Sequence, residues 1–322
     1  MSEPEVTVAV ASYHRPLRLR WLLNGLEEQT LRPERFEVLV AHGADDAETA
    51  QVLGEHPLAA QGVLRAVGGP ADSRSPTVYR NLAWRGGRAP LVAFTDDDCR
   101  PPADWLERAL AAARRHPGAV IQGRTVPDPE EIPLLAASFR HTQRIEPPAD
   151  VAQACNILYP RDLLERLGGF DESLPWGGED TDLAMRARKA GAAYVGAREV
   201  TTWHAVVPIS FAQALRGAAK WRDMPAVVKR HPELRGSFPL WIFFHRRHAW
   251  LPMALAGAAL QRRNPLWMVL AVPYAVHATP AHGTDPRGRL RGLAELPARL
   301  VEDLVGMAAM AWGSLRHRTL FL

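Results

Sequence analysis

Short apolar runs alternate with segments of helical periodicity along the first 200 residues of this chain of 322 residues. The runs predict buried strands, and the segments with apolar residues three and four apart predict amphipathic helices. The predicted strands lie at residues 6–11, 36–41, 62–67, 90–95, 119–123 and 156–159, and the predicted helices at 17–29, 47–53, 76–85, 103–115, 161–167 and 181–190. This alternation predicts an α/β fold with a doubly wound, mostly parallel sheet.

The rhythm of strands and helices stops after His204, where helical segments rich in Trp, Arg and Pro begin. We therefore expect one domain at residues 1–205 and a helical extension at residues 206–322. Residues 127–150, rich in proline and acidic residues, predict an irregular crossing segment within the first domain. The apolar stretches at 251–260 and 265–281 are short or broken by proline, so neither is expected to span a membrane.

Charge is distributed unevenly between the two parts of the chain. Residues 1–200 carry 23 Lys and Arg against 29 Asp and Glu, whereas residues 201–322 carry 16 against 6. A basic extension with tryptophans beside arginines favours an anionic membrane surface as partner. No nucleic acid is expected, because no recognition fold is visible. The alternative is a pair of core helices that packs on the first domain or in a homo-oligomer.

Two cysteines, Cys99 and Cys155, are too few for a disulfide scaffold and form no C-x-x-C motif. The acidic start of the chain lacks the basic and apolar regions of a signal peptide. We expect a cytoplasmic protein, peripheral on the inner face of the cell membrane.

Three acidic residues, Asp96, Asp97 and Asp98, follow the apolar run 90–95. Side chains at the carboxyl end of a strand lie in the crevice where α/β sheets bind ligands. Carboxylates there need a compensating charge, and a divalent cation that carries phosphates fits best. Because adjacent strand residues face opposite ways, the three are not expected to bind one ion. The alternative is an acidic turn that caps the next helix through Asp104.

Other candidates are ambiguous when each is taken alone. Glu179 and Asp180 precede a predicted helix, where carboxylates also serve as caps and interact with the helix dipole. A lone histidine such as His204 is often merely hydrogen-bonded, and Arg15 and Arg80 could equally be solvated. Their order along the chain gives them more weight.

Four segments together resemble the GT-A fold, family 2 glycosyltransferases, over roughly residues 5–205. The segments are Val8 to Pro16, Tyr79-Arg-Asn81 with Phe94 to Asp98, Asn156 to Tyr159 with Gly168 to Asp171 and Gly177 to Leu183, and Trp203-His204. The second includes a D-x-D motif. The third corresponds to the acceptor-side segments of the family.

The resemblance implies a role for each matching residue. Asp98 and His204 are implied to bind Mg²⁺ or Mn²⁺, Asp180 to act as general base, and Glu179 to orient the acceptor. The implied nucleotide-sugar contacts are Ala11, Ser12, Tyr13, Arg15, Asp45, Arg80, Asp96 and Asp97, and the implied acceptor contacts are Trp176, Gly177 and Gly178. His42 stands where the family usually has Asp, so Asp45 or Asp46 is expected to take over that role, which leaves UDP-, GDP- and dTDP-sugars open.

The predicted function is that of an inverting, metal-dependent glycosyltransferase that moves a sugar to a hydroxyl of a glycan or lipid-linked acceptor. The alternative is a non-catalytic, membrane-associated sugar-binding or partner subunit that retains the fold. A sugar-1-phosphate nucleotidyltransferase is disfavoured because the turn at residues 12–16 is no glycine-rich phosphate loop. A nicotinamide dehydrogenase is disfavoured because no G-x-G-x-x-G follows a strand.

Overall fold

The computed structural model describes residues 3–71, 73, 75–174, 177–280, 282 and 286–322. The chain forms two compact units, one of Met1–Leu135 with His141–Val207 and the other of Ala136–Arg140 with Pro208–Leu322. Residues 136–140 of the predicted crossing segment thus belong with the second unit. The two units are called the sheet unit and the helical unit below.

The sheet unit is built on one mixed sheet with the strand order β3-β2-β1-β4-β8-β6-β9-β5. Its strands are β1 (Val6–Ser12), β2 (Phe36–Gly43), β3 (Leu64–Gly69), β4 (Leu91–Asp96), β5 (Cys99–Arg100), β6 (Val120–Pro127), β8 (Asn156–Pro160) and β9 (Tyr194–His204). Strands β3, β2, β1 and β4 are parallel, as are β6 and β9, whereas β8 and β5 pair antiparallel with their neighbours. The predicted α/β class with a mostly parallel sheet is confirmed.

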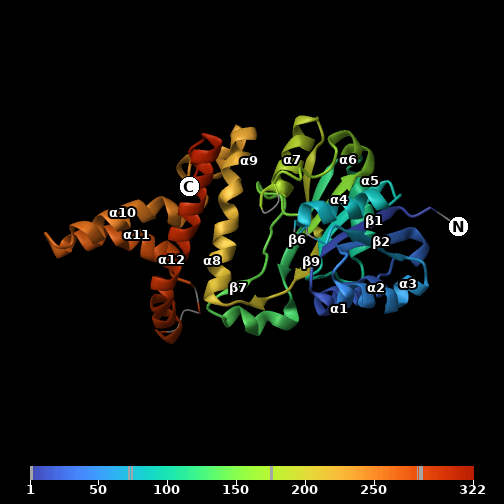
Figure 1. Ribbon diagram of the computed structural model, residues 1–322, viewed down its shortest axis with the longest axis horizontal. Helices are drawn as coiled ribbons and strands as arrows, with labels where there is room; N and C mark the ends of the chain where they lie inside the picture. Colours follow the sequence, from blue (N-terminus) through green and yellow to red (C-terminus); the bar gives the residue numbers. More distant parts are fainter. Residues whose placement is uncertain (1–2, 72, 74, 175–176, 281, 283–285) are drawn as a thin grey trace. The chain divides into compact units, whose positions relative to one another are not determined.

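Helices connect these strands (Figure 1). They are α1 (Pro16–Glu27), α2 (Ala47–Glu55), α3 (Pro57–Ala60), α4 (Pro76–Gly86), α5 (Trp105–Arg115), α6 (Arg161–Leu167) and α7 (Glu179–Lys189), with the 3₁₀ turns η1 (Pro33–Arg35) and η2 (Pro129–Ala136). Helix α7 begins two residues earlier than predicted. Its N-cap is Gly178, whose φ of 88° suits a residue without a Cβ, so Glu179 and Asp180 form the first helical turn.

Two strands of the eight-stranded sheet were absent from the prediction. Strand β9 contains a glycine, an arginine and a glutamate, which interrupt the apolar pattern that marks the other strands. Strand β5 has only two residues and follows directly after the acidic triplet. Both are strands because of their pairing, since β9 lies between β6 and β5 in the sheet.

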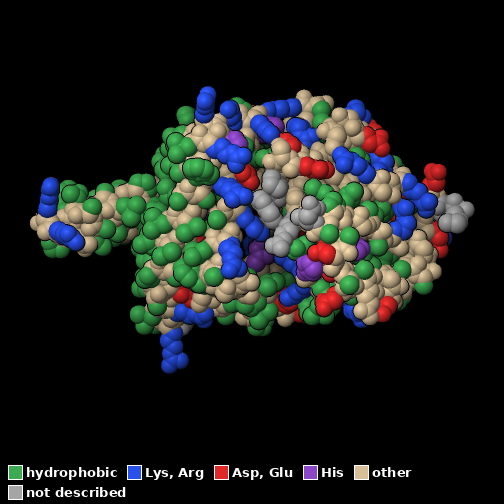
Figure 2. Space-filling view, in the orientation of Figure 1, with side chains coloured by type: hydrophobic (Ala, Val, Ile, Leu, Met, Phe, Trp, Pro, Cys, Tyr) green, Lys and Arg blue, Asp and Glu red, His purple; other side chains and the backbone are tan. Residues whose placement is uncertain are grey.

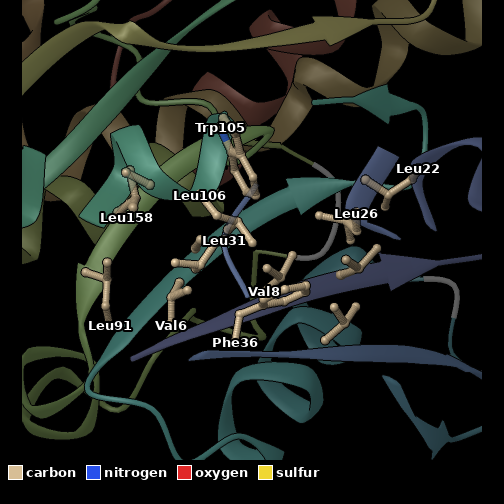
Figure 3. Close-up of a cluster of buried hydrophobic side chains, with 14 of the residues drawn as sticks. Val6, Val8, Leu22, Leu26, Leu31, Phe36, Leu91, Trp105, Leu106 and Leu158 are labelled. Carbon is tan, nitrogen blue, oxygen red and sulfur yellow. The ribbon is translucent and has the colours of Figure 1, made fainter. Parts of the chain in front are cut away.

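The core lies on both faces of the sheet, as a doubly wound fold requires. One cluster joins Val6, Val8 and Val10 of β1 to the apolar sides of α1, α2 and α5, and Figure 3 shows part of it. The other joins Ala9 of the same strand to side chains of α4, α6 and α7. Alternate residues of a strand face opposite sides, so β1 holds both layers of helices in place.

The pairing of the strands also places the candidate residues. Ala11 lies beside Asp96 in the register of β1 with β4, and Cys99 lies beside His204 in the register of β5 with β9. The end of β1, the acidic turn after β4 and the end of β9 therefore meet at one edge of the sheet.

The helical unit consists of helices and 3₁₀ turns. They are α8 (Phe211–Ala219), η3 (Lys220–Asp223), α9 (Met224–Arg230), η4 (Pro232–Ser237), η5 (Pro239–Trp241), α10 (Arg246–Leu260), η6 (Pro265–Ala271), α11 (Val272–Ala278) and α12 (Pro286–His317). The chain passes between the units at a two-stranded sheet of β7 (Arg140–His141) and β10 (Val207–Pro208). Of the helices described, none combines the length and the apolar character needed to traverse a bilayer.

The buried indole of Trp105 tests this account of the core. Its N–H donates to Asn156 Oδ1 at 3.0 Å, so Trp105→Phe leaves a buried acceptor unpaired. We expect the free energy of unfolding in urea to fall by about 1–3 kcal/mol. Trp21→Phe is the matched control, because Trp21 is 40% exposed and its loss should change that free energy by less than about 0.5 kcal/mol. Equal losses in the two variants would contradict the account.

Candidate functional site

The acidic triplet does not continue the strand. Asp96 is the last residue of β4, whereas Asp97 and Asp98 form the turn that leads into β5. Arg15 Nη1 lies 3.2 Å from Asp97 Oδ1 and 2.9 Å from Asp98 Oδ2, and Ser12 Oγ donates to Asp97 Oδ2 at 3.0 Å. Burial and the charge of Asp98 raise the pKa of Asp97. The turn is thus held against the end of β1, and its carboxylates face one arginine.

Asp98 and His204 form a buried pair with donor atoms suited to a cation. His204 Nδ1 lies 2.9 Å from the carbonyl oxygen of Ala205, which can only accept, so in the neutral ring Nδ1 carries the proton. The unprotonated Nε2 then faces Asp98 Oδ1 at 3.4 Å. Two electron-rich atoms in this arrangement need a cation or a proton between them. Cys99 Sγ lies in the same cluster, where the ligand atoms are within 4.8 Å of one another.

Cys99 remains a thiol in this cluster. Its hydrogen bonding with Cys155 and its burial raise the pKa of Cys99 well above the ordinary range. A neutral thiol is a poor ligand for a hard divalent ion. The residues of this cluster that could hold a divalent ion are therefore Asp98 and His204.

Arg80 joins the acidic turn to the start of α7. It lies on α4, with a side chain 9% exposed. Its Nη2 donates to Asp96 Oδ1 and its Nη1 to Glu179 Oε1, each at 2.8 Å. Burial disfavours the charged guanidinium, but the two carboxylates raise the pKa of Arg80 above its ordinary value. Arg80 thus bridges two protein carboxylates, those of Asp96 and Glu179. The contact of Arg80 with a nucleotide, which the sequence predicts, stays a prediction.

Asp180 follows Glu179 in the first turn of α7. Its Oδ1 accepts from the backbone N–H of Thr181 at 2.8 Å and its Oδ2 from that of Ala154 at 3.2 Å. Burial, followed by the neighbouring charge of Glu179, raises the pKa of Asp180 to about 7. Each carboxylate oxygen has a second lone pair free to accept a proton. Asp180 is therefore an oriented carboxylate that exchanges its proton near neutral pH.

Two neighbouring acids, Asp45 and Asp46, lie between β2 and α2 and have different surroundings. Asp46 caps α2 by accepting from the Thr49 N–H at 3.1 Å, and it also accepts from the His14 N–H at 2.7 Å. It is buried and holds the shape of the turn that contains Tyr13 and His14. Asp45 is exposed, and its carboxylate lies 4.0 Å from His14 Nε2. Of the two acids, Asp45 is the one with free access to a ligand.

The acceptor-side residues are described in part. Gly177 and Gly178 lead directly into α7, and Gly178 is its N-cap. Trp176, which the sequence also predicts to contact the acceptor, lies outside the described residues. Asp182 accepts from Arg186 Nε at 2.7 Å, and Arg186 also donates to the carbonyls of Leu167 and Gly169, which ties α7 to the preceding turn.

The structure adds His141, which the sequence analysis left unassigned. Its ring lies edge-on to that of His204, with the centroids 5.5 Å apart. It comes from the predicted crossing segment, where no apolar pattern or motif marks it. Burial, together with the charge that His204 can carry, lowers the pKa of His141. The proximity of His141 to His204 is therefore seen only in the folded chain.

Comparison with known proteins identifies the family. The model of the Glycosyltransferase like family 2 matches residues 4–223, which is more than half of the chain. The chain belongs to this family. It is a glycosyltransferase with the GT-A fold, as the sequence resemblance predicted.

Relatives of this glycosyltransferase include Glycosyltransferase AglE of Haloferax volcanii, 25% identical over 64% of this chain and 68% of the relative. Validoxylamine A glucosyltransferase of Streptomyces hygroscopicus subsp. limoneus is 26% identical over 72% of this chain and 58% of the relative. Among solved structures, the chain is similar to the mannosyltransferase PcManGT from Pyrobaculum calidifontis, which was solved in complex with GDP-Man and Mn²⁺. The two are 21% identical, the match covers 99% of this chain and 88% of PcManGT, and the TM-score is 0.58. TarS of S. aureus in complex with UDP-GlcNAc is 16% identical, with coverage of 98% and 92% and a TM-score of 0.54.

Removing the Arg80 bridge tests the geometry of the site. Arg80→Met leaves Asp96 and Glu179 without their cation, and we expect the free energy of unfolding to fall by about 3–5 kcal/mol at pH 7. Burial raises the pKa of Asp96, but the charge and hydrogen bond of Arg80 outweigh it and lower that pKa. The stabilisation is thus present above the unfolded pKa of Asp96 and lost as pH falls through the folded value. The loss in the variant should shrink in acid.

The matched control is Arg85→Met on the same helix, because Arg85 is half-exposed and lies 3.8 Å from the exposed Glu172. Its loss should change the free energy of unfolding by less than about 1 kcal/mol. An Arg80 variant as stable as the Arg85 variant would show that the bridge is not formed.

Proposed function

We propose that the protein is an inverting, metal-dependent glycosyltransferase that moves a sugar from a nucleotide-sugar to a hydroxyl acceptor. The observation that carries this proposal is the Arg80 bridge between Asp96 and Glu179. Asp96 ends β4 directly before the acidic turn that contains Asp98, and Glu179 lies next to Asp180. The bridge therefore links the proposed nucleotide-binding part of the site to the part that contains the proposed base.

Asp98 and His204 fit a divalent cation in this proposal. Their facing Oδ1 and Nε2 atoms are both buried, and the proton on His204 Nδ1 is directed away toward Ala205. An imidazole ligand favours Mn²⁺ over Mg²⁺, which prefers oxygen ligands. When bound, such an ion supplies positive charge that stabilises the diphosphate leaving group. Arg15, which contacts Asp97 and Asp98, is the proposed partner of the same phosphates.

Asp180 is the proposed general base. Its carboxylate takes the proton of the acceptor hydroxyl while that oxygen forms a bond to the anomeric carbon. The bond from the anomeric carbon to the diphosphate oxygen breaks in the same displacement, and the nucleoside diphosphate leaves with the electron pair. Attack opposite the leaving group inverts the anomeric configuration. Two backbone N–H groups, of Thr181 and Ala154, hold the carboxylate in one orientation.

The relatives support the substrate classes without fixing them. PcManGT was solved with GDP-Man and Mn²⁺, and TarS with UDP and with UDP-GlcNAc. His42 is buried and contacts the Gly43 carbonyl, which leaves the exposed Asp45 as the acidic candidate for the nucleoside. Relatives named for O-antigen and succinoglycan biosynthesis favour a glycan or lipid-linked acceptor. A cytoplasmic enzyme at the membrane surface would meet both substrates.

The proposed base sets the pH dependence of turnover. Asp180 must be ionised to accept a proton, so kcat/KM should rise with pH through an apparent pKa of about 7. Glu179→Gln removes a negative charge that raises the pKa of Asp180. The rising limb of the plot of kcat/KM against pH should therefore move to lower pH by about one unit. Asp180→Asn should lower kcat about 10²- to 10⁴-fold. The exposed Glu165→Gln is the control and should leave the limb in place. A limb that stays at the same pH in Glu179→Gln would contradict the assignment.

The donor site is tested by thermal shift with UDP, GDP, dTDP and CDP, each with and without Mn²⁺. One nucleotide should stabilise the protein by about 2.7 kcal/mol at a hundredfold excess over Kd, and only when Mn²⁺ is present. Asp98→Asn and His204→Gln should lose this stabilisation, whereas Asp162→Asn, an exposed carboxylate, should keep it.

Two outcomes count against the proposal. Stabilisation that survives EDTA and Asp98→Asn would exclude metal-assisted binding at this pair. Stabilisation without turnover of any donor, even to water, would favour the alternative of a non-catalytic sugar-binding or partner subunit.

A further inference from the structure

A helical hairpin of the helical unit exposes an apolar stripe that no described residue of the unit covers. The hairpin comprises α10, the turn 261–264, η6 and α11, and Figure 1 shows it projecting from α12. Leu266, Val269, Val272 and Val276 form the stripe, with exposed fractions of 76%, 65%, 53% and 70%. Their spacing of three, three and four residues along a 3₁₀ turn and a helix places them on one side.

The hairpin is fixed to α12 by apolar packing and by hydrogen bonds. Leu251 and Ala254 of α10 and Tyr274 and Ala278 of α11 form a buried cluster against side chains of α12. Asp303 of α12 accepts from Arg247 Nε at 2.6 Å and from the Tyr274 hydroxyl at 3.0 Å. Gly257 lets η6 approach α10 closely, because a Cβ there would meet the Trp267 carbonyl. The stripe is therefore presented on a fixed support.

The charge of the hairpin identifies what the stripe contacts. Residues 234–284 contain no Asp or Glu, and the turn of the hairpin contains Arg262 and Arg263. Figure 2 shows hydrophobic side chains over the hairpin and Lys or Arg at its tip. Two tryptophans of the hairpin are also partly exposed, Trp250 at 38% and Trp267 at 44%. Tryptophan beside apolar side chains and arginine is typical of a membrane interface, and uncompensated arginines favour anionic lipid.

The dimensions decide how the hairpin meets the bilayer. Helix α10 has 15 residues and is about 22 Å long, short of the hydrocarbon core of about 30 Å. Entry tip-first would also bury Arg262 and Arg263 in hydrocarbon, which is costly. A hairpin that lies in the plane of the interface instead places the stripe among the acyl chains and lets the arginines reach phosphates.

We propose that residues 246–278 dock the protein on an anionic bilayer, with the stripe of Leu266, Val269, Val272 and Val276 inserted and with Arg262 and Arg263 on lipid phosphates. The proposal names the segment and the lipid chemistry, and it does not depend on the transferase chemistry. Docking on the bilayer would place the glycosyltransferase where lipid-linked acceptors are.

Sedimentation of the full chain with vesicles tests the proposal. Vesicles of phosphatidylcholine with about a third phosphatidylglycerol should bind the protein, and pure phosphatidylcholine should bind it about thirtyfold more weakly, since two arginines lose their anionic partners. Arg262→Gln with Arg263→Gln should abolish this difference. Leu266→Gln, Val269→Gln and Val276→Gln together should weaken binding to both vesicles more than a hundredfold.

The matched control is Leu290→Gln, Leu293→Gln and Leu315→Gln on α12, whose side chains are 67%, 54% and 76% exposed. It should bind vesicles as the unmodified protein does. Binding that the control loses and the stripe variant keeps would overturn the assignment to the hairpin, as would no binding to either vesicle. A dimer in solution that the stripe variant converts to a monomer would assign the stripe to a second copy of the chain and overturn the membrane proposal. Circular dichroism of each variant shows that a loss of binding is not a loss of fold.

Discussion

The buried guanidinium of Arg80 is the constraint on which the candidate site depends. A charge removed from water costs several kcal/mol unless partners compensate it, and Arg80 has two, Asp96 and Glu179. These three residues come from α4, from the end of β4 and from the start of α7. The buried charge of Arg80 is compensated only when all three elements meet, so the same interaction that satisfies Arg80 fixes the end of β4 relative to the proposed base.

Negative charge at this edge of the sheet exceeds what the described arginines there neutralise. Arg15 pairs with Asp97 and Asp98, and Arg80 pairs with Asp96 and Glu179, while Asp180 follows Glu179 in the first turn of α7. Two features of this edge are chemically useful. Burial and the neighbouring charge of Glu179 together raise the pKa of Asp180 toward neutrality, the range in which a general base works best, and the facing atoms of Asp98 and His204 are the candidate ligands of a cation. In the proposed function, the site therefore combines a base on one side with an attraction for a metal-bound diphosphate on the other.

Local sequence patterns predicted most strands and helices, because buried strands carry continuous apolar runs and helices carry apolar residues three and four apart. Strand β9 was not predicted, because Gly196, Arg198 and Glu199 break that pattern. Its strand conformation depends on pairing with its neighbours in the sheet. The sequence also indicated which residues gather at the site. It could not indicate that Arg80 contacts Asp96 and Glu179 or that His141 lies beside His204, since such contacts join residues up to 99 positions apart and form only in the folded chain.

The central claim is a single displacement with Asp180 as the base, and the stereochemistry of transfer tests it most directly. Water can take the place of the acceptor, so the anomer first released from a turned-over nucleotide-sugar can be followed by proton NMR before mutarotation. The account predicts that the first anomer has the configuration opposite to that of the donor, and that Asp180→Asn releases it at least about a hundredfold more slowly. A first product with the configuration of the donor would contradict it.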